Sequence, residues 1–225
     1  MFNFSKLTGI LLGQHCLLCG AGNAQNTGIC SGCLTDLPWH DTSSCPQCGL
    51  ASNGLVCGAC LSHPPHYDAT QAVFTYAYPV DAMLQRFKYA EMLNLGHTFG
   101  QLLAQNTASQ NIDLIIPMPM HPKRIQERGF NQALEIARHL DKSKLDTHSA
   151  IRQKLTPPQA GLPLKERVKN IKGAFAVNAD LTGKRIAIVD DVMTSGASLN
   201  ELAKTLKKAG ANHVECWVIG RTLPK

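Results

Sequence analysis

The sequence predicts an α/β protein in which a small cysteine-rich module precedes a mostly parallel sheet with helices on both faces. Three observations predict this class. Eight of the nine cysteines lie between positions 16 and 60. From position 67 onward, short apolar runs typical of buried strands alternate with amphipathic runs typical of helices. Near the C-terminus, one predicted strand leads into two aspartates, a loop of small residues and a helix.

Length and composition fit a globular domain with a small appendage. The chain has 225 residues, of which 44% are hydrophobic and 17% charged, which disfavours long disorder and a fibrous repeat. No stretch has the roughly 18 consecutive apolar residues of a membrane span. Aromatic residues make up only 6% of the chain, which disfavours a nucleic-acid surface built from many stacking rings.

The start of the chain has an apolar run at residues 7–12 but few features of an export signal. Lys6 is the only charge before this run, and Gln14 and His15 stand where a cleavage site requires small residues. We therefore expect a short helix over 7–12 that packs on the body of the protein, and a cytoplasmic location.

The clustered cysteines form four CxxC pairs with metal-ligand spacing: Cys16/Cys19, Cys30/Cys33, Cys45/Cys48 and Cys57/Cys60. Two such turns supply the four sulfurs that Zn²⁺ accepts in a tetrahedron, so four turns predict two structural zinc sites. Sequential pairing of the turns and interleaved pairing both satisfy the spacing. Disulfides, an iron–sulfur cluster and a redox motif are the alternatives. They are disfavoured by the missing export signal, the missing CxxCxxC run and the fourfold repetition of the motif.

Residues 1–66 are expected to form the double zinc module, and residues 67–225 the α/β domain. The first segment has only three charged residues and too few apolar residues to bury a core, so metal would supply most of its folding free energy. Pro64 and Pro65 mark the boundary.

Periodicity predicts the elements of the second domain in order. Residues 72–78 predict a strand or half of a hairpin, and residues 80–89 a helix with Met83, Leu84 and Phe87 on one face. A helix over 93–105 and a buried strand at 112–117, stopped by proline, come next. A helix over 130–140, a polar loop, strands at 174–177 and 184–191, a helix over 197–210 and a strand at 213–220 follow. Cys216 in the last strand is expected to be a buried structural thiol.

The motif that carries chemistry is IAIVDDVMTSGAS at residues 186–198. Ligands of open α/β sheets bind beyond the carboxyl ends of strands, where Asp190 and Asp191 are expected to face solvent. The loop after them presents backbone N–H groups at a helix N-terminus, which suits a phosphate, and carboxylates suit sugar hydroxyls. The motif therefore predicts a site for ribose and its 5′-phosphate. A capping box of Ser198 and Glu201 would explain the helix start, but not the two acids.

This motif resembles the 5-phosphoribosyl 1-pyrophosphate (PRPP) motif of type I phosphoribosyltransferases, and the whole chain resembles the ComF family of competence-related proteins. Further similarities lie in IPMPMHPKRIQERGFNQ at residues 116–132 and around Gln159, Arg167, Asn170 and residues 173–175. The resemblance implies a phosphoribosyltransferase-like fold preceded by a double zinc ribbon.

The resemblance also implies roles for individual residues. Asp190 and Asp191 would bind the ribose hydroxyls, and the loop 194–198 would bind the 5′-phosphate. The implied PRPP-binding residues are Asp190, Asp191, Val192, Met193, Thr194, Ser195, Gly196, Ala197 and Ser198. Lys123 and Arg124 would stabilise the pyrophosphate, and Mg²⁺ would be held mainly by oxygens of the ligand.

Positive charge is concentrated between residues 121 and 172. This segment has 12 Lys and Arg residues and 5 Asp and Glu residues, a net charge of +7, whereas the whole chain has a net charge of +6. Such a field suits a polyanionic small ligand or nucleic acid, unless the charges only solvate the surface. We expect weak binding of single-stranded DNA, with Lys142, Lys144, Arg152 and Lys154 away from the ribose-phosphate loop.

The predicted function is that of a PRPP-binding protein in the uptake and use of DNA during natural transformation, a role that the resemblance alone supplies. An inactive PRPP- or DNA-binding module with a regulatory or scaffolding role is one alternative, and a phosphoribosyltransferase of nucleotide salvage is another. No residue identifies an acceptor base or a general base, so enzyme activity stays open. The expected partners are PRPP or a related ribose phosphate, single-stranded DNA and other DNA-uptake proteins.

Overall fold

The computed structural model describes residues 15–41, 43–89, 92–107, 111–156 and 164–224. Within these ranges the elements, in chain order, are α2 (Ser31–Thr35), α3 (Gly58–Ser62), β1 (Ala69–Thr75), α4 (Val80–Lys88), α5 (Leu95–Asn106), β2 (Leu114–Pro117), α6 (Pro122–Arg128), α7 (Gln132–Ala137), β3 (Ala150–Arg152), α8 (Leu164–Ile171), β4 (Phe175–Val177), β5 (Arg185–Met193), α9 (Ala197–Lys208) and β6 (His213–Arg221). The helix expected over 7–12 lies outside the described residues. No helix in the described ranges combines the length and apolarity needed to cross a membrane.

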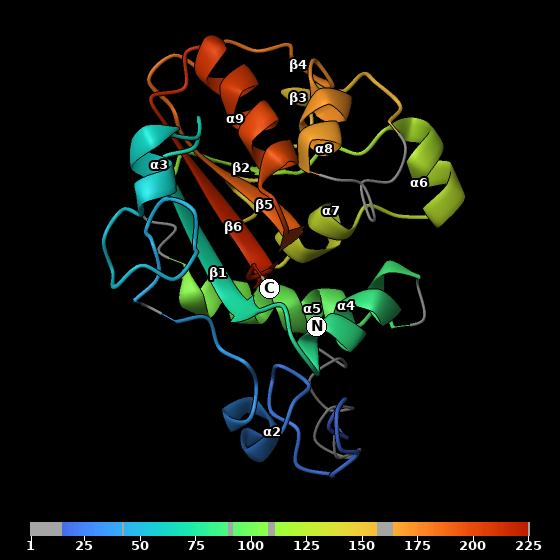
Figure 1. The fold of residues 1–225 in the computed structure, drawn as a ribbon. Helices are drawn as coiled ribbons and strands as arrows, with labels where there is room; N and C mark the ends of the chain where they lie inside the picture. The colour runs from blue at the N-terminus through green and yellow to red at the C-terminus, as the bar shows by residue number, and fades with distance from the viewer. Residues whose placement is uncertain (1–14, 42, 90–91, 108–110, 157–163, 225) are drawn as a thin grey trace.

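Helices cover both faces of a four-stranded parallel sheet with the strand order β1-β6-β5-β2 (Figure 1). α5 and α7 pack on one face together with α4, and α9 packs on the other face beside α8 and β4. β3 and β4 form a separate antiparallel pair. The expected mostly parallel, helix-covered sheet is therefore confirmed. The hairpin alternative for the first strand is wrong, because β1 pairs in parallel with the distant β6.

The central strand β5 is buried on both faces, which explains its continuous apolar sequence. Successive side chains of a strand point to opposite faces of the sheet. Ala187 and Val189 accordingly lie in the core cluster with α4 and α5, whereas Ile186 and Ile188 lie in the cluster with α9. Cys216 of β6 is fully buried in this second cluster, as expected.

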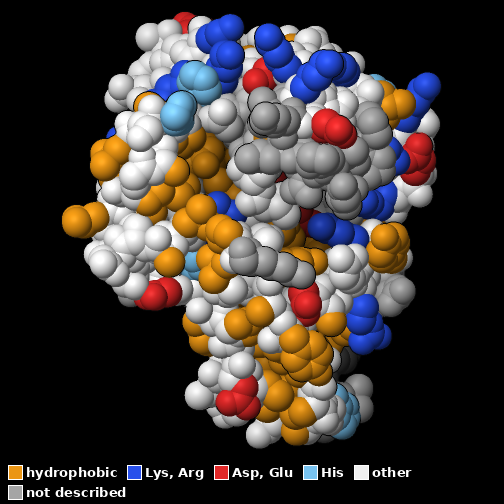
Figure 2. Space-filling model, viewed as in Figure 1, with side chains coloured by type: hydrophobic (Ala, Val, Ile, Leu, Met, Phe, Trp, Pro, Cys, Tyr) orange, Lys and Arg blue, Asp and Glu red, His pale blue; other side chains and the backbone are white. Residues whose placement is uncertain are grey.

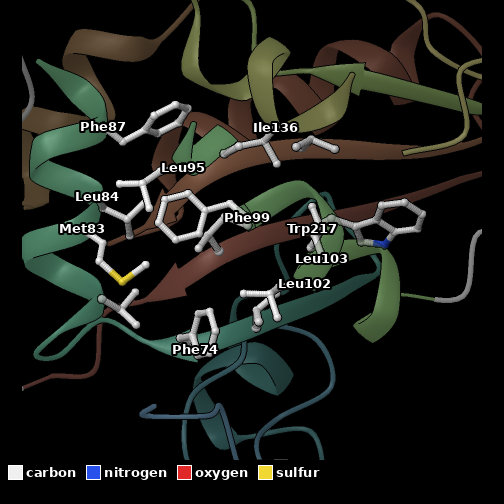
Figure 3. Packing of buried hydrophobic residues seen from close by; sticks show 14 of the residues in the cluster. Phe74, Met83, Leu84, Phe87, Leu95, Phe99, Leu102, Leu103, Ile136 and Trp217 are labelled. Carbon is white, nitrogen blue, oxygen red and sulfur yellow. The ribbon is translucent and has the colours of Figure 1, made fainter. Parts of the chain in front are cut away.

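Helix α4 buries one face in the first cluster, and Figure 3 shows its side chains directed into that core. Met83, Leu84 and Phe87 are all buried, which confirms the predicted apolar face. The rings of Phe87 and Phe99 meet edge-on, with centroids 5.8 Å apart. This packing holds the C-terminal end of α4, where Lys88 lies, against the sheet.

In the α/β part of the chain, three short elements lie in segments where periodicity predicted none: α6, β3 and α8. Helix α6 has clear local signals at both ends. Pro122 occupies its first position, and Gly129 follows its end in the left-handed region with a φ of 87°. Strand β3 has three residues, which is too short for an alternating pattern to be visible in the sequence.

The cysteine-rich segment packs closely on the α/β body. Ile29 and Leu37 are buried in the first core cluster, and Thr98 Oγ1 donates a hydrogen bond to the Thr27 carbonyl (2.6 Å). Between the two cysteine groups, His40 N donates to Val73 O (3.0 Å) and closes the free edge of β1. Some apolar residues of this segment are therefore buried on the body, while others such as Leu55 and Leu61 are exposed, and a domain boundary at residue 66 stays a prediction.

Candidate metal and ribose-phosphate sites

The clustered cysteines form two groups of four. Within each group the sulfur atoms lie within 4.8 Å of one another, and the groups are Cys16, Cys19, Cys30 and Cys33, and Cys45, Cys48, Cys57 and Cys60. Sequential pairing is thereby confirmed and interleaved pairing is wrong. All nine cysteines lie in described segments, and none of them is paired in a disulfide. Figure 1 shows α2 of the first group below α4 and α5, and α3 of the second group beside β1.

The sulfur positions fit a tetrahedral zinc ion. A Zn–S bond of about 2.3 Å separates neighbouring sulfurs by about 3.8 Å. The Sγ atoms of Cys19 and Cys30 are 3.7 Å apart, and those of Cys48 and Cys57 are also 3.7 Å apart. Both groups can therefore accept the ion without rearrangement of the backbone.

Backbone amides favour the thiolate form of one cysteine in each group. Burial raises the pKa of Cys16, but amide donors, among them Cys30 N at 3.4 Å from its sulfur, outweigh this effect and lower the pKa to about 6. Burial also raises the pKa of Cys45, but amide donors, among them Cys57 N at 3.3 Å from its sulfur, outweigh this effect and lower the pKa to about 7. The thiolate is the form that binds zinc.

We expect the purified protein to contain two zinc ions per chain, and Cys45→Ser to contain one. Cys45 is buried inside the second group, so the loss of its sulfur should open that group and expose residues 43–62 to protease. Elemental analysis and limited proteolysis measure the two effects. Cys216→Ala is the matched control, because this ninth cysteine belongs to neither group and the variant should keep both ions. Iron in the purified protein would contradict the prediction.

The two aspartates of the chemical motif lie inside β5. The strand continues to Met193, because residues 190–193 still pair with β6. The neighbouring β2 ends at Pro117, opposite Val189. The position predicted for the acids is therefore corrected: they lie before the end of their own strand, but just beyond the end of the adjacent one.

The two carboxylates face opposite sides of the sheet, as neighbours in a strand must. Asp191 faces α4, where its Oδ2 lies 3.1 Å from Lys88 Nζ and 13% of its side chain is exposed. Asp190 is half-buried, and its Oδ1 accepts a hydrogen bond from Asp191 N (2.9 Å). The expectation that both side chains face solvent is wrong. Burial, together with repulsion from Asp191, raises the pKa of Asp190 to about 8.

The loop 194–198 and Asp190 enclose a small hollow of about 40 Å³. Gly196 in this loop has a φ of 75°, in the left-handed region that glycine adopts without strain. A Cβ atom at this position would lie 2.9 Å from Met193 Cε and 3.0 Å from the Tyr67 hydroxyl. A side chain at this position would therefore have to displace Met193 or Tyr67, so the conformation of this loop requires glycine at residue 196.

Helix α9 begins beside this hollow with Gly196, which has no side chain, at its N-cap position, and Ala197 N donates a hydrogen bond to the Ser195 hydroxyl (3.4 Å). Ser198 lies inside the helix, and Glu201 Oε1 accepts a hydrogen bond from Gly173 N (2.8 Å). The capping-box alternative is therefore wrong. The start of this 12-residue helix offers N–H groups and the positive end of the helix dipole to an anion.

Two clefts lie near the aspartates. A polar cleft of about 200 Å³ is lined by Lys88, Tyr89, Arg124, Glu127 and Arg128. Arg124, one of the two residues predicted to bind pyrophosphate, lines this cleft with Lys88 and forms an ion pair with Glu127 (2.7 Å). The other, Lys123, is exposed and does not line the cleft.

A larger cleft of about 330 Å³ opens at the end of β2, between prolines and aliphatic side chains, with Arg152 on its wall. The Arg152 guanidinium lies 5.6 Å from the centre of the Phe175 ring. Burial lowers the pKa of Arg152, and the charge of Asp190 acts in the opposite direction. Arg152 does not line the hollow at loop 194–198, so the expectation that it lies away from the ribose-phosphate loop stays a prediction.

Three residues near the site have no signal in the sequence. Lys88 resembles an ordinary cation at a helix C-terminus, Tyr67 precedes a predicted strand, and Arg221 follows one. Only the packing of α4 on the sheet brings Lys88 to Asp191. None of the three residues lies within the 186–198 motif, so the motif itself gives no sign of them.

Comparison with known proteins assigns the class of protein. The double zinc ribbon domain matches residues 7–61, and the phosphoribosyl transferase domain matches residues 94–221. The chain therefore belongs to the phosphoribosyl transferase domain family, with a double zinc ribbon before that domain.

Two curated relatives cover most of the chain. Competence protein F of Haemophilus influenzae is 32% identical over 227 residues, which is 92% of this chain and 96% of that protein. DNA utilization protein YhgH of Escherichia coli K12 is 32% identical over 208 residues, or 87% of this chain and 91% of that protein. These relatives confirm the resemblance to the ComF family. A solved purine phosphoribosyltransferase from Pyrococcus horikoshii is 22% identical over 52% of this chain and 66% of that chain, with a TM-score of 0.34.

Proposed function

We propose that this protein binds PRPP at the C-terminal part of β5. The observation that carries the proposal is the hollow formed by Asp190 and the loop 194–198 at the start of α9. The loop amides would bind the 5′-phosphate, and the Asp190 carboxylate would accept hydrogen bonds from ribose hydroxyls. Lys88 and Arg124 would face the pyrophosphate from the polar cleft.

Lys88 has a defined role in this proposal. In the free protein it balances the charge of Asp191 at 3.1 Å. A pyrophosphate in the polar cleft would attract the same ammonium group. A bound Mg²⁺ would supply charge neutralisation for the pyrophosphate. Lys88 would then contact both the sheet and the ligand, so that binding would further fix the end of α4.

A cytoplasmic role in the uptake and use of DNA during natural transformation completes the proposal. It is supported by the names of the relatives, Competence protein F and DNA utilization protein. Calorimetric titration of the zinc-loaded protein with PRPP, with and without Mg²⁺, tests the binding. We expect saturable binding with one site per chain, and the absence of binding heat at every PRPP concentration would refute the proposal.

Phosphoribosyl transfer is a second candidate function, favoured by the apolar cleft of about 330 Å³ at the end of β2. Its aliphatic walls suit an organic group, and Arg152 on its wall supplies a positive charge. Labelled PRPP incubated with candidate acceptors separates the two functions. Release of pyrophosphate together with a labelled ribosylated product supports the transferase, whereas binding without turnover supports a binding module.

The basic segment 121–172 leads to a prediction for single-stranded DNA. Figure 2 shows Lys and Arg side chains gathered over the upper half of this face, around α8 and α9. The logarithm of affinity should fall linearly with the logarithm of salt concentration, by about 0.7 for each phosphate contact. Lys142→Glu with Lys154→Glu should flatten the slope by about two such contacts, because both lysines are exposed.

Fluorescence anisotropy of a labelled oligonucleotide at several salt concentrations measures this slope. Arg86→Glu is the control, an exposed arginine of α4 that lies outside the segment and outside α8 and α9. Equal slopes for all variants would contradict direct binding by this segment. Complete displacement of the oligonucleotide by PRPP with Mg²⁺ would instead assign the basic segment to the small-ligand pocket, and a DNA role would then require partner proteins.

A further inference from the structure

Arg221, the last residue of β6, joins the second cysteine group to the proposed phosphate loop. It is buried, with 4% of its surface exposed. Its Nε donates a hydrogen bond to the carbonyl of Cys48, a residue of the second group, at 2.7 Å. Its Nη1 donates to the carbonyls of Met193 (3.0 Å) and Thr194, where the loop begins, and also to Thr222 (3.0 Å). One planar guanidinium thus spans the two sites with its fixed set of donors.

These hydrogen bonds set the direction of the loop amides. In a planar trans peptide, the N–H group points away from the preceding carbonyl oxygen. Because the carbonyls of Met193 and Thr194 point at Arg221, the N–H groups of Thr194 and Ser195 point to the other side. Successive N–H groups that face one side form an anion-binding concavity. Arg221 therefore shapes the part of the loop that would receive the phosphate.

The cysteine turn that holds Arg221 is itself fixed to the sheet. Thr70 of β1 forms hydrogen bonds with the two carbonyls that precede Cys48. Its N donates to Pro46 O (2.9 Å), and its Oγ1 donates to Gln47 O (2.7 Å). Three successive carbonyls of the turn are thus bound by the α/β body. The first cysteine group has no comparable hydrogen bond to the loop among the described residues. Beside this group, Thr98 of α5 donates a hydrogen bond to the Thr27 carbonyl.

The filled second site also matches the charge of Arg221. No carboxylate in the described ranges forms an ion pair with this buried guanidinium within 4.0 Å. Four thiolates around one divalent cation carry net negative charge. The cysteine group beside Arg221 would therefore supply the anion that a buried cation requires.

We infer that Arg221 is a positioning residue that couples zinc occupancy of the second cysteine group to phosphate binding by the loop 194–198. The inference rests on the proposed PRPP site. Zinc fixes the turn that carries the Cys48 carbonyl, the turn fixes Arg221, and Arg221 fixes the loop. Loss of the second zinc ion should therefore weaken PRPP binding, whereas loss of the first should not.

Arg221→Lys tests the coupling, because lysine keeps the charge but has no planar fork to reach both backbones. With both zinc ions retained, its PRPP affinity should fall by about tenfold or more. Hydrogen exchange of the amides in 193–198 should accelerate by a similar factor, while that in β2 and the first half of β5 should not change. Cys48→Ser should show the same two effects through loss of one zinc ion. Cys19→Ser, which empties the first site, is the control and should keep wild-type affinity within about twofold.

The outcomes separate this inference from the proposed PRPP site. If the wild type does not bind PRPP, the proposed function fails, and the exchange of residues 193–198 in Arg221→Lys still decides the coupling. Wild-type affinity and wild-type exchange in Arg221→Lys would overturn the inference. Equal losses in Cys19→Ser and Cys48→Ser would also overturn it, because they would show general destabilisation. Should Arg221→Lys fold poorly, Thr70→Val is the second variant, because it removes the hydrogen bond to Gln47. It should lower PRPP affinity and accelerate exchange in 193–198, but by smaller factors than Arg221→Lys.

Discussion

The double substitution Asp190→Asn with Asp191→Asn is expected to abolish measurable PRPP binding while the sheet stays folded. A hydrogen bond to a charged group contributes about 1.5 to 3 kcal/mol, so the loss of the Asp190 carboxylate, which would accept from two ribose hydroxyls, should lower affinity by a hundredfold or more. Asparagine keeps the shape of each side chain. The fold should persist because β5 is held by Ile186, Ile188 and Val189, all fully buried, which the substitutions do not touch.

The single variants distinguish the two acids. Asp190 lines the hollow beside the loop, so Asp190→Asn should account for most of the loss. Asp191 pairs with Lys88, and its variant should act mainly by releasing that ammonium group. Calorimetry with PRPP, together with thermal unfolding, measures both effects. Asp141→Asn with Asp180→Asn is the control for charge, since both of these aspartates lie in exposed turns. Unchanged affinity in the double variant would show that the acids are structural.

The sequence was sufficient to predict the elements whose patterns are set by burial. β5 and β6 are covered on both faces, so their apolar runs are long enough to recognise. The zinc ligands were equally predictable, because the CxxC spacing follows from the size of the ion. The choice between sequential and interleaved pairing was not, since it depends on how the turns fold back on the body.

The predictions that failed concern tertiary contacts. The motif indicated two acids at a strand end, but pairing with β6 extends β5 to Met193. No local pattern reveals that Asp191 faces Lys88, because this contact joins segments far apart in the chain. Charge counting predicts a solvated basic surface for Arg152, whereas its guanidinium packs against the Phe175 ring and lines the apolar cleft. The residues that tune the site therefore lie outside its motif.

The affinity for PRPP is expected to rise about tenfold between pH 7 and pH 9, because Asp190 must be ionised to accept hydrogen bonds from two hydroxyls. Burial and repulsion from Asp191 raise the pKa of Asp190 to about 8 in the free protein. At pH 7 most molecules therefore carry a proton on Asp190, and binding must release it. Above pH 8 this requirement disappears. Phosphate groups lose their second proton near pH 6, so the ligand contributes little to the slope in this range.

The free energy of unfolding of the free protein should fall as the pH rises, whereas the affinity for PRPP should increase. The pKa of Asp190 is higher in the folded state than in the unfolded chain, so its protonation stabilises the fold at low pH, and this stabilisation is lost as the pH rises through 8. Calorimetry in buffers of different ionisation enthalpy should detect release of a proton at pH 7 and not at pH 9. Asp191→Asn removes the repulsion and should shift the rise in affinity to lower pH. Asp190→Asn should abolish the dependence of affinity on pH in this range. Equal wild-type affinity at pH 7 and pH 9 would mean that Asp190 is already ionised before PRPP binds.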